Sequence, residues 1–300
     1  MPSHRKAKPS SWPRTIGHPS NGVPAGHGPA RKVHSLTYMP EITRTLSVVV
    51  PTWNDEAALR ETLAAFETLS PEVRQELEVV VADGGSDDGT LTVLGEHMDL
   101  VQVAHSQSDQ GVYDAMNRAV GWSRTPWIWV MGAGDLPNAA GLEHALATLR
   151  SSPNDEGHAW KVSALPPVEP GVPATFVPEW GTNLTWRNTM HHQGVIVPRH
   201  WLVDHPFDVQ YKVLGDYAWM LDMRKSGRSI ACHLDKTLAR VASKGLSRQF
   251  NKALYFEEWR MKRTRLAGRQ LWAQPFWLCA KWAFKQVSKT RRSLGSSTPQ

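Results

Sequence analysis

The chain has 300 residues, of which 41% are hydrophobic and 21% charged, and its formal net charge is +6. This composition is that of an ordinary globular protein, and no apolar run approaches the roughly 20 residues that span a bilayer. Only Cys232 and Cys279 are present, which argues against a disulfide framework or a zinc ribbon and fits a reducing, cytoplasmic compartment.

Charge is distributed unevenly along the chain. Residues 1–44 carry seven Lys or Arg against one Glu, and residues 259–300 carry ten Lys or Arg and no acid, so the residues between them are net acidic. An acidic body with basic ends argues against nucleic acid as a partner. It favours an acidic metal or sugar site, with ends that suit an anionic surface.

Residues 1–44 are rich in Pro, Gly, Ser and His and lack a hydrophobic period, which predicts a disordered basic tail. Four short apolar runs follow, at 46–50, 77–82, 100–104 and 127–131, and helical patterns separate them. This alternation predicts an α/β fold in which helices flank a mostly parallel sheet.

The loops after these four strands carry most of the polar motifs. Right-handed crossovers place the carboxyl ends of the strands at one edge, so the loops at 51–55, 83–88, 106–111 and 132–135 should line a single crevice. Asp87 or Asp88 is expected to cap the helix that begins near Thr90. No dinucleotide or P-loop fingerprint is present. The crevice instead offers carboxylates, which can hold a diphosphate through magnesium or manganese.

The second half of the chain is less regular. Residues 152–189 contain several prolines and few periodic stretches, which predicts a loop-rich acceptor region. Further patterns predict a strand at 194–197, a helix at 216–223, edge strands at 230–232 and 237–241, and a basic helix at 247–266.

Seven motifs follow one another between residues 48 and 217. They are Val-Val-Val-Pro-Thr-Trp-Asn (48–54), Asp-Gly-Gly-Ser-Asp-Asp-Gly-Thr (83–90), Ser-Asp-Gln-Gly-Val-Tyr-Asp-Ala-Met-Asn (108–117), Gly-Ala-Gly-Asp (132–135), His-His-Gln-Gly (191–194), Phe-Asp (207–208) and Gly-Asp-Tyr (215–217). In this order they resemble glycosyltransferase family 2. The chain looks most similar to the bacterial branch that builds exopolysaccharides and lipid-linked surface glycans, of the colanic-acid type.

The resemblance implies a GT-A domain at 45–250, with a nucleotide-sugar half at 45–150 and an acceptor half at 151–250. It also implies a nucleotide-diphosphate sugar donor, a divalent cation (Mg or Mn), inversion at the anomeric carbon, and a glycan or polyprenyl-lipid-linked acceptor.

By position in the family's motifs, Asp216 would be the catalytic base and Asp135 would hold the cation. Asp83 would hydrogen-bond the nucleobase or the ribose. The residues that the resemblance places at the nucleotide-sugar are Pro51, Thr52, Trp53, Asp83, Gly84, Asp109, Tyr113, Asp114, Asn117 and Gly134. Those placed near the acceptor or the diphosphate are His191, His192 and Gln193.

These residue types suit the chemistry. Inverting transfer needs a carboxylate within hydrogen-bond reach of the acceptor hydroxyl, and a helix start favours the charge of Asp216. A cation on Asp135 would stabilise the leaving diphosphate. Either carboxylate could instead be a helix cap, and the pair of histidines could be structural. The turn at 244–247 could contact diphosphate or be a plain turn.

Two departures from the family pattern matter. Gly84 stands where the family more often has Asp, and Gly134 precedes a lone Asp135 where the family usually has more than one acid. Two alternatives therefore stay open. One is a metal-dependent nucleotidyltransferase or phosphodiester hydrolase that uses Asp83, Asp135 and His191. The other is an inactive scaffold that binds nucleotide or glycan.

The last segment, 251–300, predicts basic, aromatic helices. Aromatic residues interleave with lysines in 271–285, and basic residues continue to Arg292. This pattern suits a helix in a membrane interface, with peripheral contact through 268–292 at the inner face of the cell membrane. The alternative is a helix packed on the catalytic domain.

Overall fold

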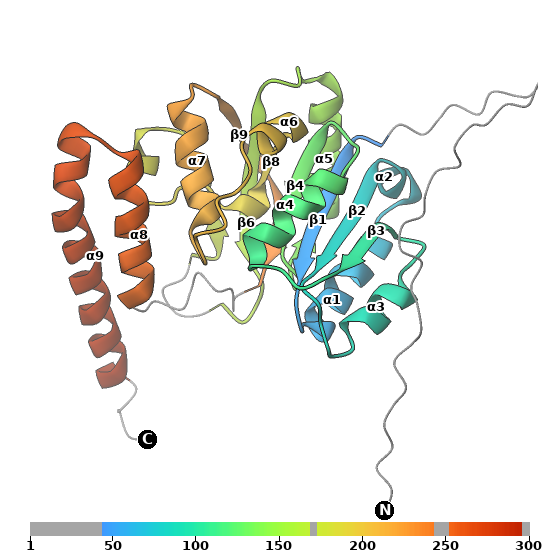
Figure 1. Cartoon of the computed structure of the whole chain (residues 1–300), viewed down its shortest axis with the longest axis horizontal. Helices are drawn as coiled ribbons and strands as arrows, with labels where there is room; N and C mark the ends of the chain where they lie inside the picture. Colours follow the sequence, from blue (N-terminus) through green and yellow to red (C-terminus); the bar gives the residue numbers. More distant parts are fainter. Residues whose placement is uncertain (1–43, 169–172, 243–251, 296–300) are drawn as a thin grey trace, which may run out of the picture. The chain divides into compact units, whose positions relative to one another are not determined.

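The computed structural model describes residues 44–168, 173–242 and 252–295. The predicted tail, apart from Arg44, and the predicted turn at 244–247 lie outside these ranges. The strands in the described ranges are β1 (Leu46–Thr52), β2 (Leu77–Asp83), β3 (Val101–Ser106), β4 (Trp127–Val130), β5 (Leu136–Pro137), β6 (Gly157–Ala164), β7 (Thr175–Phe176), β8 (Val195–Pro198) and β9 (Ile230–Val241). They form one sheet with the order β3-β2-β1-β4-β8-β6-β9-β5, and β7 pairs with β6 (Figure 1).

Helices cover both faces of this sheet (Figure 1). The helices of the described ranges are α1 (Glu56–Glu67), α2 (Pro71–Gln75), α3 (Thr90–Glu96), α4 (Val112–Trp122), α5 (Ala139–Ser151), α6 (Arg199–Asp204), α7 (Gly215–Lys225), α8 (Lys252–Arg265) and α9 (Gly268–Gly295), with short 3-10 turns η1 (Thr182–Thr185) and η2 (His192–Gly194). Of these, α8 packs beside α7 and α9 packs beside α8, away from the sheet (Figure 1).

The four predicted parallel strands are confirmed: β3, β2, β1 and β4 run parallel, in that order. Successive side chains of a strand point to opposite faces. Val48 and Val50 therefore join the core formed with α1, α3 and α5, whereas Val49 joins the core formed with α4, α6 and α7. Burial on both faces explains why these strands read as continuous apolar runs.

The second half of the sheet differs from the prediction. The stretch 152–189 is not loop-rich throughout, because it contains the eight-residue strand β6, which pairs with β8 and β9. The two predicted edge strands are one strand, β9, which lies inside the sheet between β6 and β5. Its register against β6 shifts between His233 and Thr237, where the prediction left a gap. The predicted strand at 194–197 is confirmed as β8.

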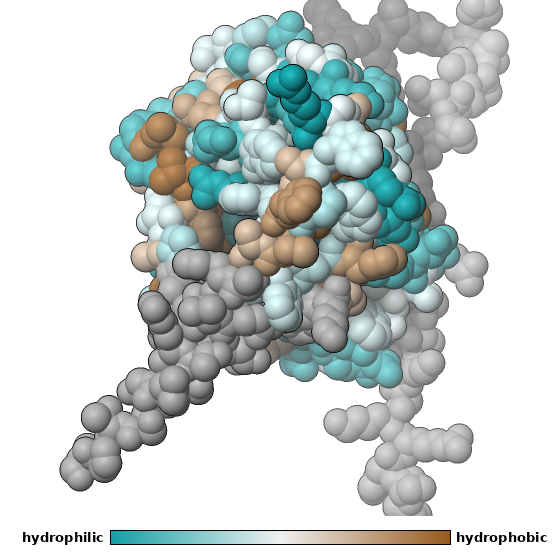
Figure 2. Space-filling view, turned by 90° about the vertical axis from the view of Figure 1, so that its left-hand side faces the viewer, coloured by the Kyte–Doolittle hydropathy of each residue, from teal (hydrophilic) through white to brown (hydrophobic). Residues whose placement is uncertain are grey.

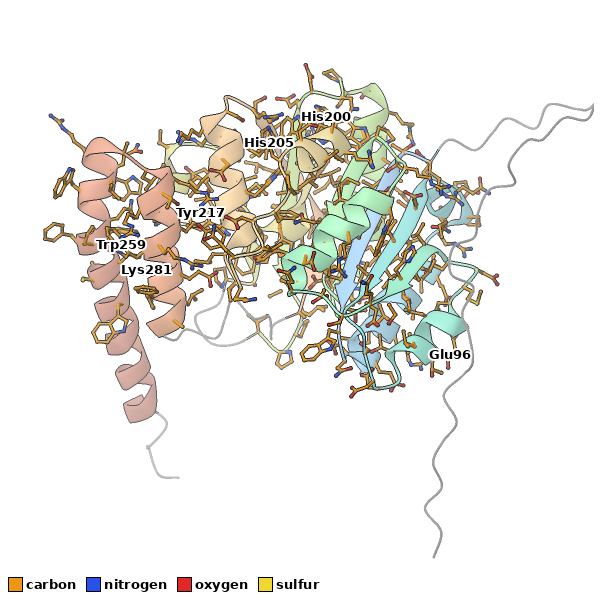
Figure 3. The ribbon with its side chains drawn as sticks, in the orientation of Figure 1. Glu96, His200, His205, Tyr217, Trp259 and Lys281 are labelled. Atoms are coloured by element: carbon orange, nitrogen blue, oxygen red, sulfur yellow. The ribbon has the colours of Figure 1, made fainter. Side chains whose placement is uncertain are left out.

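A buried charged cluster joins the two C-terminal helices. Glu258 of α8 accepts a hydrogen bond from Lys281 of α9 at 2.7 Å and pairs with Lys262 at 2.9 Å. Figure 3 labels Lys281 between the two helices. Lys262 is fully buried and also donates to the carbonyl of Trp186, at 2.8 Å. Burial lowers the pKa of Lys262, and Glu258 opposes that shift.

The variant Glu258→Gln would leave the ammonium of Lys262 buried without its counter-charge. Removing one partner of a buried ion pair costs about 3–5 kcal/mol, so the free energy of unfolding in urea should fall by that amount. The control is Glu96→Gln, which removes the exposed partner of Arg60 and should leave stability nearly unchanged. Equal effects of the two variants would contradict a structural role for Glu258.

Candidate active site

The carboxyl ends of β1, β2 and β3 lie side by side at one edge of the sheet. Thr52 pairs with Asp83, and Asp83 pairs with Ser106. The carboxylate of Asp83 accepts hydrogen bonds from the amides of Gly85 and Ser86, at 3.2 and 3.0 Å. It also accepts from the hydroxyls of Ser86 and Ser106. A buried carboxylate needs such donors, so Asp83 orders the turn that follows β2. Its contact with a nucleotide stays a prediction.

Thr52 is the polar neighbour of Asp83 at this edge. It is 6% exposed, and its hydroxyl has no hydrogen-bond partner among the described residues. Leaving a buried hydroxyl unpaired costs about 1–3 kcal/mol, which points to a ligand as its partner. Trp53 is 66% exposed, whereas Pro51 is buried in the sheet. Thr52 and Trp53 are therefore better placed to contact a nucleotide than Pro51.

Position 84 has little room for a side chain, because the carboxylate of Asp109 lies next to it. A Cβ atom at Gly84 would lie 2.9 Å from Oδ2 of Asp109 and 3.2 Å from Cβ of Trp53. The amide of Gly111 donates to Asp109 at 2.8 Å and fixes that carboxylate. Asp109, from the loop after β3, thus occupies the space that a side chain at position 84 would need.

Asp88 joins the amino ends of two helices. It accepts from the amide of Thr90 at the start of α3 (2.9 Å) and from the amide of Glu56 at the start of α1 (3.1 Å). The predicted cap by Asp87 or Asp88 is wrong in its position, because the N-cap residue of α3 is Gly89 and Asp88 lies one residue before it. Asn54 adds a second link by accepting from the amide of Asp87, at 2.9 Å. These bonds join the loop after β1 to the loop after β2.

Asp135 lies at the end of the loop that follows β4, and it is 3% exposed. Its Oδ1 accepts from the amide of Ala242 at 2.9 Å. Its Oδ2 accepts from the amide of Gly132 at 2.9 Å and from Nε2 of Gln193 at 3.0 Å. Burial raises the pKa of Asp135, and these donors oppose the shift.

The surroundings of Asp135 are held from α1. The hydroxyl of Thr62 donates to the carbonyl of Asp135 at 2.9 Å and accepts from the amide of Gly134 at 2.8 Å. Gly134 therefore shapes this loop through its backbone. The alternative of Asp135 as a helix cap is wrong, because the side chain of Asn138 caps α5.

Three consecutive residues before β8 connect the two halves of the domain. His191 Nδ1 lies 2.6 Å from Oε1 of Gln193, which leaves the amide nitrogen of Gln193 to donate to Asp135. His192 Nδ1 lies 3.0 Å from Oδ2 of Asp216. Neighbouring residues thus reach two different carboxylates, one from each half.

Asp216 begins α7, and its side chain is 13% exposed. The hydroxyl of Tyr113 has one proton, which it shares between the carbonyl of Val213 at 2.7 Å and Oδ1 of Asp216 at 3.1 Å. This close approach requires Gly215, where a Cβ would lie 2.7 Å from the Tyr113 ring. Tyr113, expected at the nucleotide-sugar, therefore contacts the candidate base, and Oδ1 of Asp216 stays the less strongly bonded oxygen.

His192 and Asp216 each shift the pKa of the other. Burial alone would raise the pKa of Asp216, but the hydrogen bond and charge of His192 outweigh it and hold the pKa below the ordinary 3.8. Burial alone would lower the pKa of His192, but Asp216 raises it above the ordinary 6.5. Between these two pKa values the pair is an imidazolium–carboxylate ion pair.

Asp114 and Asn117 lie on α4, at the floor of the crevice. Asn117 accepts from the amide of Phe207 and donates to its carbonyl, both at 2.8 Å. Asp114 accepts from the amide of Gln110 at 3.0 Å and pairs with Arg118 at 2.8 Å. Both residues order the loops around them, and direct contacts with a sugar stay a prediction.

The amino end of α7 is held by a residue that the sequence analysis missed. Glu257 of α8 accepts from the amides of Val213 and Leu214, both at 2.9 Å, and from the amide of Lys212 at 3.2 Å. A carboxylate here pairs the three amides just before α7 and complements the dipole of the helix. Glu257 therefore fixes the position of Asp216.

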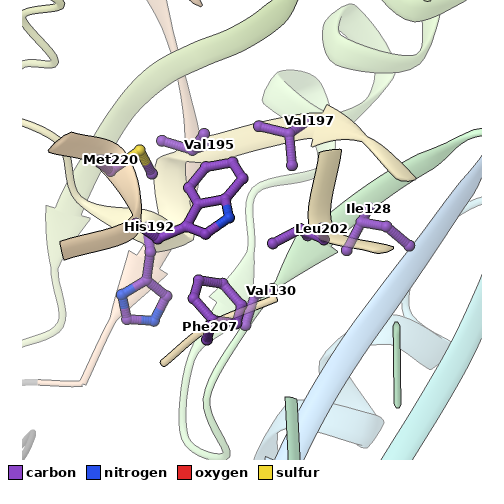
Figure 4. A pocket seen from close by; sticks show the side chains of 9 residues that line it. Ile128, Val130, His192, Val195, Val197, Leu202, Phe207 and Met220 are labelled. Carbon is purple, nitrogen blue, oxygen red and sulfur yellow. The ribbon is translucent and has the colours of Figure 1, made fainter. Parts of the chain in front are cut away.

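An apolar cavity of about 20 Å³ lies next to His192 (Figure 4). The other residues that line it are Ile128, Val130, Val195, Val197, Leu202, Phe207, Trp219 and Met220. The imidazole of His192 points away from most of them (Figure 4). The space holds at most about one water molecule, and its apolar lining offers a water few hydrogen-bond partners. Apolar packing therefore holds His192 in place while its ring faces Asp216.

The surroundings of Asp135 fit a divalent cation with a single protein ligand. Its carboxylate accepts three N–H bonds and has about four lone-pair positions, so one remains. No group of three or more His, Cys, Asp or Glu that could hold a metal occurs in the described ranges. Most ligands of a cation would then be diphosphate oxygens and water. The hydrolase alternative built on Asp83, Asp135 and His191 gains no support from this geometry.

A mixed sheet with helices on both faces, whose parallel half carries Asp83 and Asp135 at the strand ends, fits the GT-A fold that the sequence resemblance implies. Solved structures confirm this fold. S. aureus TarS 1–349, in complex with UDP-GlcNAc, matches with a TM-score of 0.60 at 20% identity, over 74% of this chain and 66% of that chain. The mannosyltransferase PcManGT from Pyrobaculum calidifontis, in complex with GDP-Man and Mn²⁺, matches with a TM-score of 0.52 at 18% identity, over 89% and 80% of the chains.

Residues 47–156 match the family model Glycosyl transferase family 2. A PGL/p-HBAD biosynthesis glycosyltransferase of Mycobacterium bovis is 36% identical over 96 residues, which are 30% of this chain and 35% of that relative. Validoxylamine A glucosyltransferase of Streptomyces hygroscopicus is 35% identical over 107 residues, 34% of this chain and 23% of that relative. The matches thus span about a third or less of these relatives. The family model and both relatives carry the name of one enzyme class, the glycosyltransferases.

The coupling of His192 to Asp216 predicts a titration that can be measured directly. In side-chain NMR, the pKa of His192 should lie above 6.5, and Asp216→Asn should lower it by about one unit or more. Asp222→Asn, on the same helix, is the control and should leave it unchanged. The pair's contribution to stability should be lost as pH falls through the pKa of Asp216, below 3.8, and as pH rises through that of His192. A His192 that titrates alike in all three proteins would rule out the ion pair.

Proposed function

We propose that this chain is an inverting glycosyltransferase of bacterial surface polysaccharide or glycolipid synthesis. It would transfer a sugar from a nucleotide-diphosphate donor to a glycan or a polyprenyl-lipid-linked acceptor. The observation that carries the proposal is the pair of bonds from His192 and Gln193. These adjacent residues bind Asp216 of the acceptor half and Asp135 of the nucleotide half.

The donor is proposed to lie over the edge formed by β1, β2 and β4. The unpaired hydroxyl of Thr52 and the exposed ring of Trp53 are proposed to contact the nucleotide. Two solved structures of the same fold support a nucleotide-sugar, since they are complexes with UDP-GlcNAc and GDP-Man. Asp135 would hold a divalent cation, magnesium or manganese, which neutralises charge on the diphosphate when bound.

Asp216 is proposed as the general base. As the acceptor oxygen bonds to the anomeric carbon, the proton of that hydroxyl passes to Oδ1 of Asp216. The bond between the anomeric carbon and the diphosphate oxygen breaks, and the nucleoside diphosphate leaves with the electron pair. The His192 imidazolium and Tyr113 orient the carboxylate and keep it ionised before the transfer. Because the acceptor approaches from the side opposite the leaving group, the configuration inverts.

The variant Asp216→Asn keeps the size of the side chain and removes the base. Transfer of radiolabelled sugar into membrane lipid should fall about 100-fold or more, while calorimetric binding of the nucleotide should stay within about twofold. The control is Asp222→Asn. Asp222 lies on the same helix and pairs with Arg265 instead of His192, so the activity of this variant should match the wild type. Loss of nucleotide binding in Asp216→Asn would remove it from the base role. Nucleotide binding by a wild-type protein that transfers no sugar would favour the scaffold.

The role of Asp135 is tested by calorimetric titration with UDP, GDP and dTDP, with and without manganese. One nucleotide should bind at least about tenfold more tightly with manganese, equivalent to about 1.4 kcal/mol. Asp135→Asn, with its fold checked by thermal melting, should lose this gain but keep metal-free binding. Equal affinity in the presence of a chelator would contradict the cation.

A further inference from the structure

The helix α9 is attached to the rest of the molecule by polar as well as apolar side chains. Its inner side carries Gln274, which is fully buried and donates to the carbonyl of Thr185 at 3.2 Å. The same side carries Lys281, which pairs with Glu258, and the buried Leu278. Polar contacts thus fasten α9 together with an apolar one, where a surface helix normally packs mainly apolar side chains.

The outer side of α9 carries large aromatic residues. Trp272, Phe276 and Trp282 are 80%, 81% and 45% exposed. Their spacing of four and ten residues, at 100° per residue, puts them on one face of the helix, together with exposed Pro275 and Cys279. We call these five residues the outer face of α9. Exposed aromatic groups gathered in this way mark an interaction surface.

Two exposed positive charges accompany the outer face of α9. Arg263 at the end of α8 and Arg269 at the start of α9 are both exposed, and residues 259–300 contain no acid. Figure 2 looks onto this side of the molecule and shows apolar and strongly polar residues next to one another. Tryptophan with arginine is the combination that interfacial helices present to anionic headgroups.

We propose that the outer face of α9 lies in the headgroup region of an anionic membrane. No helix in the described part of the chain is long and apolar enough to cross a bilayer. A second copy of this chain is the less favourable occupant, because pairing two outer faces would bring two basic, acid-free segments together. Negative lipids complement that charge.

The attachment of α9 connects this surface to the acceptor half. Gln274 and Trp277 donate to the carbonyls of Thr185 and Trp186, in and just after η1. An open cavity of about 420 Å³ lies at this joint, lined by Asn183, Trp186, Arg187 and Trp277. A membrane-bound α9 would therefore keep the acceptor half close to lipid. This consequence rests on the proposed function, whereas the membrane contact does not.

The test is co-sedimentation of the full chain with sucrose-loaded vesicles, without donor or acceptor. The wild type should bind phosphatidylcholine vesicles that contain about 30% phosphatidylglycerol, and bind pure phosphatidylcholine weakly. The triple variant Trp272→Ser, Phe276→Ser, Trp282→Ser should bind at least about tenfold less. Arg263→Gln with Arg269→Gln should weaken binding to the anionic vesicles alone, about tenfold or more.

The matched control is Met98→Ser with Leu234→Ser, which removes two exposed apolar side chains from other parts of the surface. It should bind vesicles as the wild type does, and calorimetric nucleotide binding should be equal in all variants. Unchanged sedimentation of the triple variant would overturn the proposal. The proposal would also be overturned if the wild type were a dimer in ultracentrifugation and the triple variant were a monomer that still binds vesicles as the wild type does. Vesicle binding by a protein that transfers no sugar would sink only the proposed function.

Discussion

The candidate site depends on two hydrogen bonds from adjacent residues. His192 and Gln193 lie in η2, where one turn of 3-10 helix points successive side chains in different directions, and each reaches a carboxylate from a different half of the domain. Both bonds lie in a partly buried region, where electrostatic interactions are stronger than in water. A covalently continuous dipeptide thereby links the positions of Asp135 and Asp216.

The donors that hold Asp83 and Asp135 differ in type from those that hold Asp216, and this difference separates the roles of the three carboxylates. Asp83 and Asp135 accept mostly from backbone amides and hydroxyl or amide side chains, which keeps each of them in one orientation. Asp216 instead faces an ionisable imidazole and a shared phenolic proton. Neutral donors suit a carboxylate that positions a ligand, and a charged, partly exposed pair suits one that exchanges a proton.

The strands of the parallel half could be predicted because burial on both faces leaves a continuous apolar run. The strand β6 could not, since it carries His158, Lys161 and Ser163 and lacks such a run. Asp83 and Asp135 were found from their position after strands, and Asp216 from its place in the order of the family's motifs. The residues that hold them were not found, because Thr62 lies 73 residues from Asp135, and Glu257 lies 43 residues from Leu214. Contacts at such separations are decided by packing, which local periodicity does not encode.

The bonds from Glu257 to the three amides before α7 also determine when, during synthesis, the start of that helix is anchored. A chain leaves the ribosome from its amino end, and domains fold as their segments emerge. The helix with Asp216 is therefore made before the carboxylate that fixes its start. Until α8 has followed, the segment at 212–214 lacks this anchor, and the candidate base lacks one of the contacts that place it beside His192. A nascent chain would then form the parallel half of its sheet early and complete the geometry of the candidate site only after residue 257.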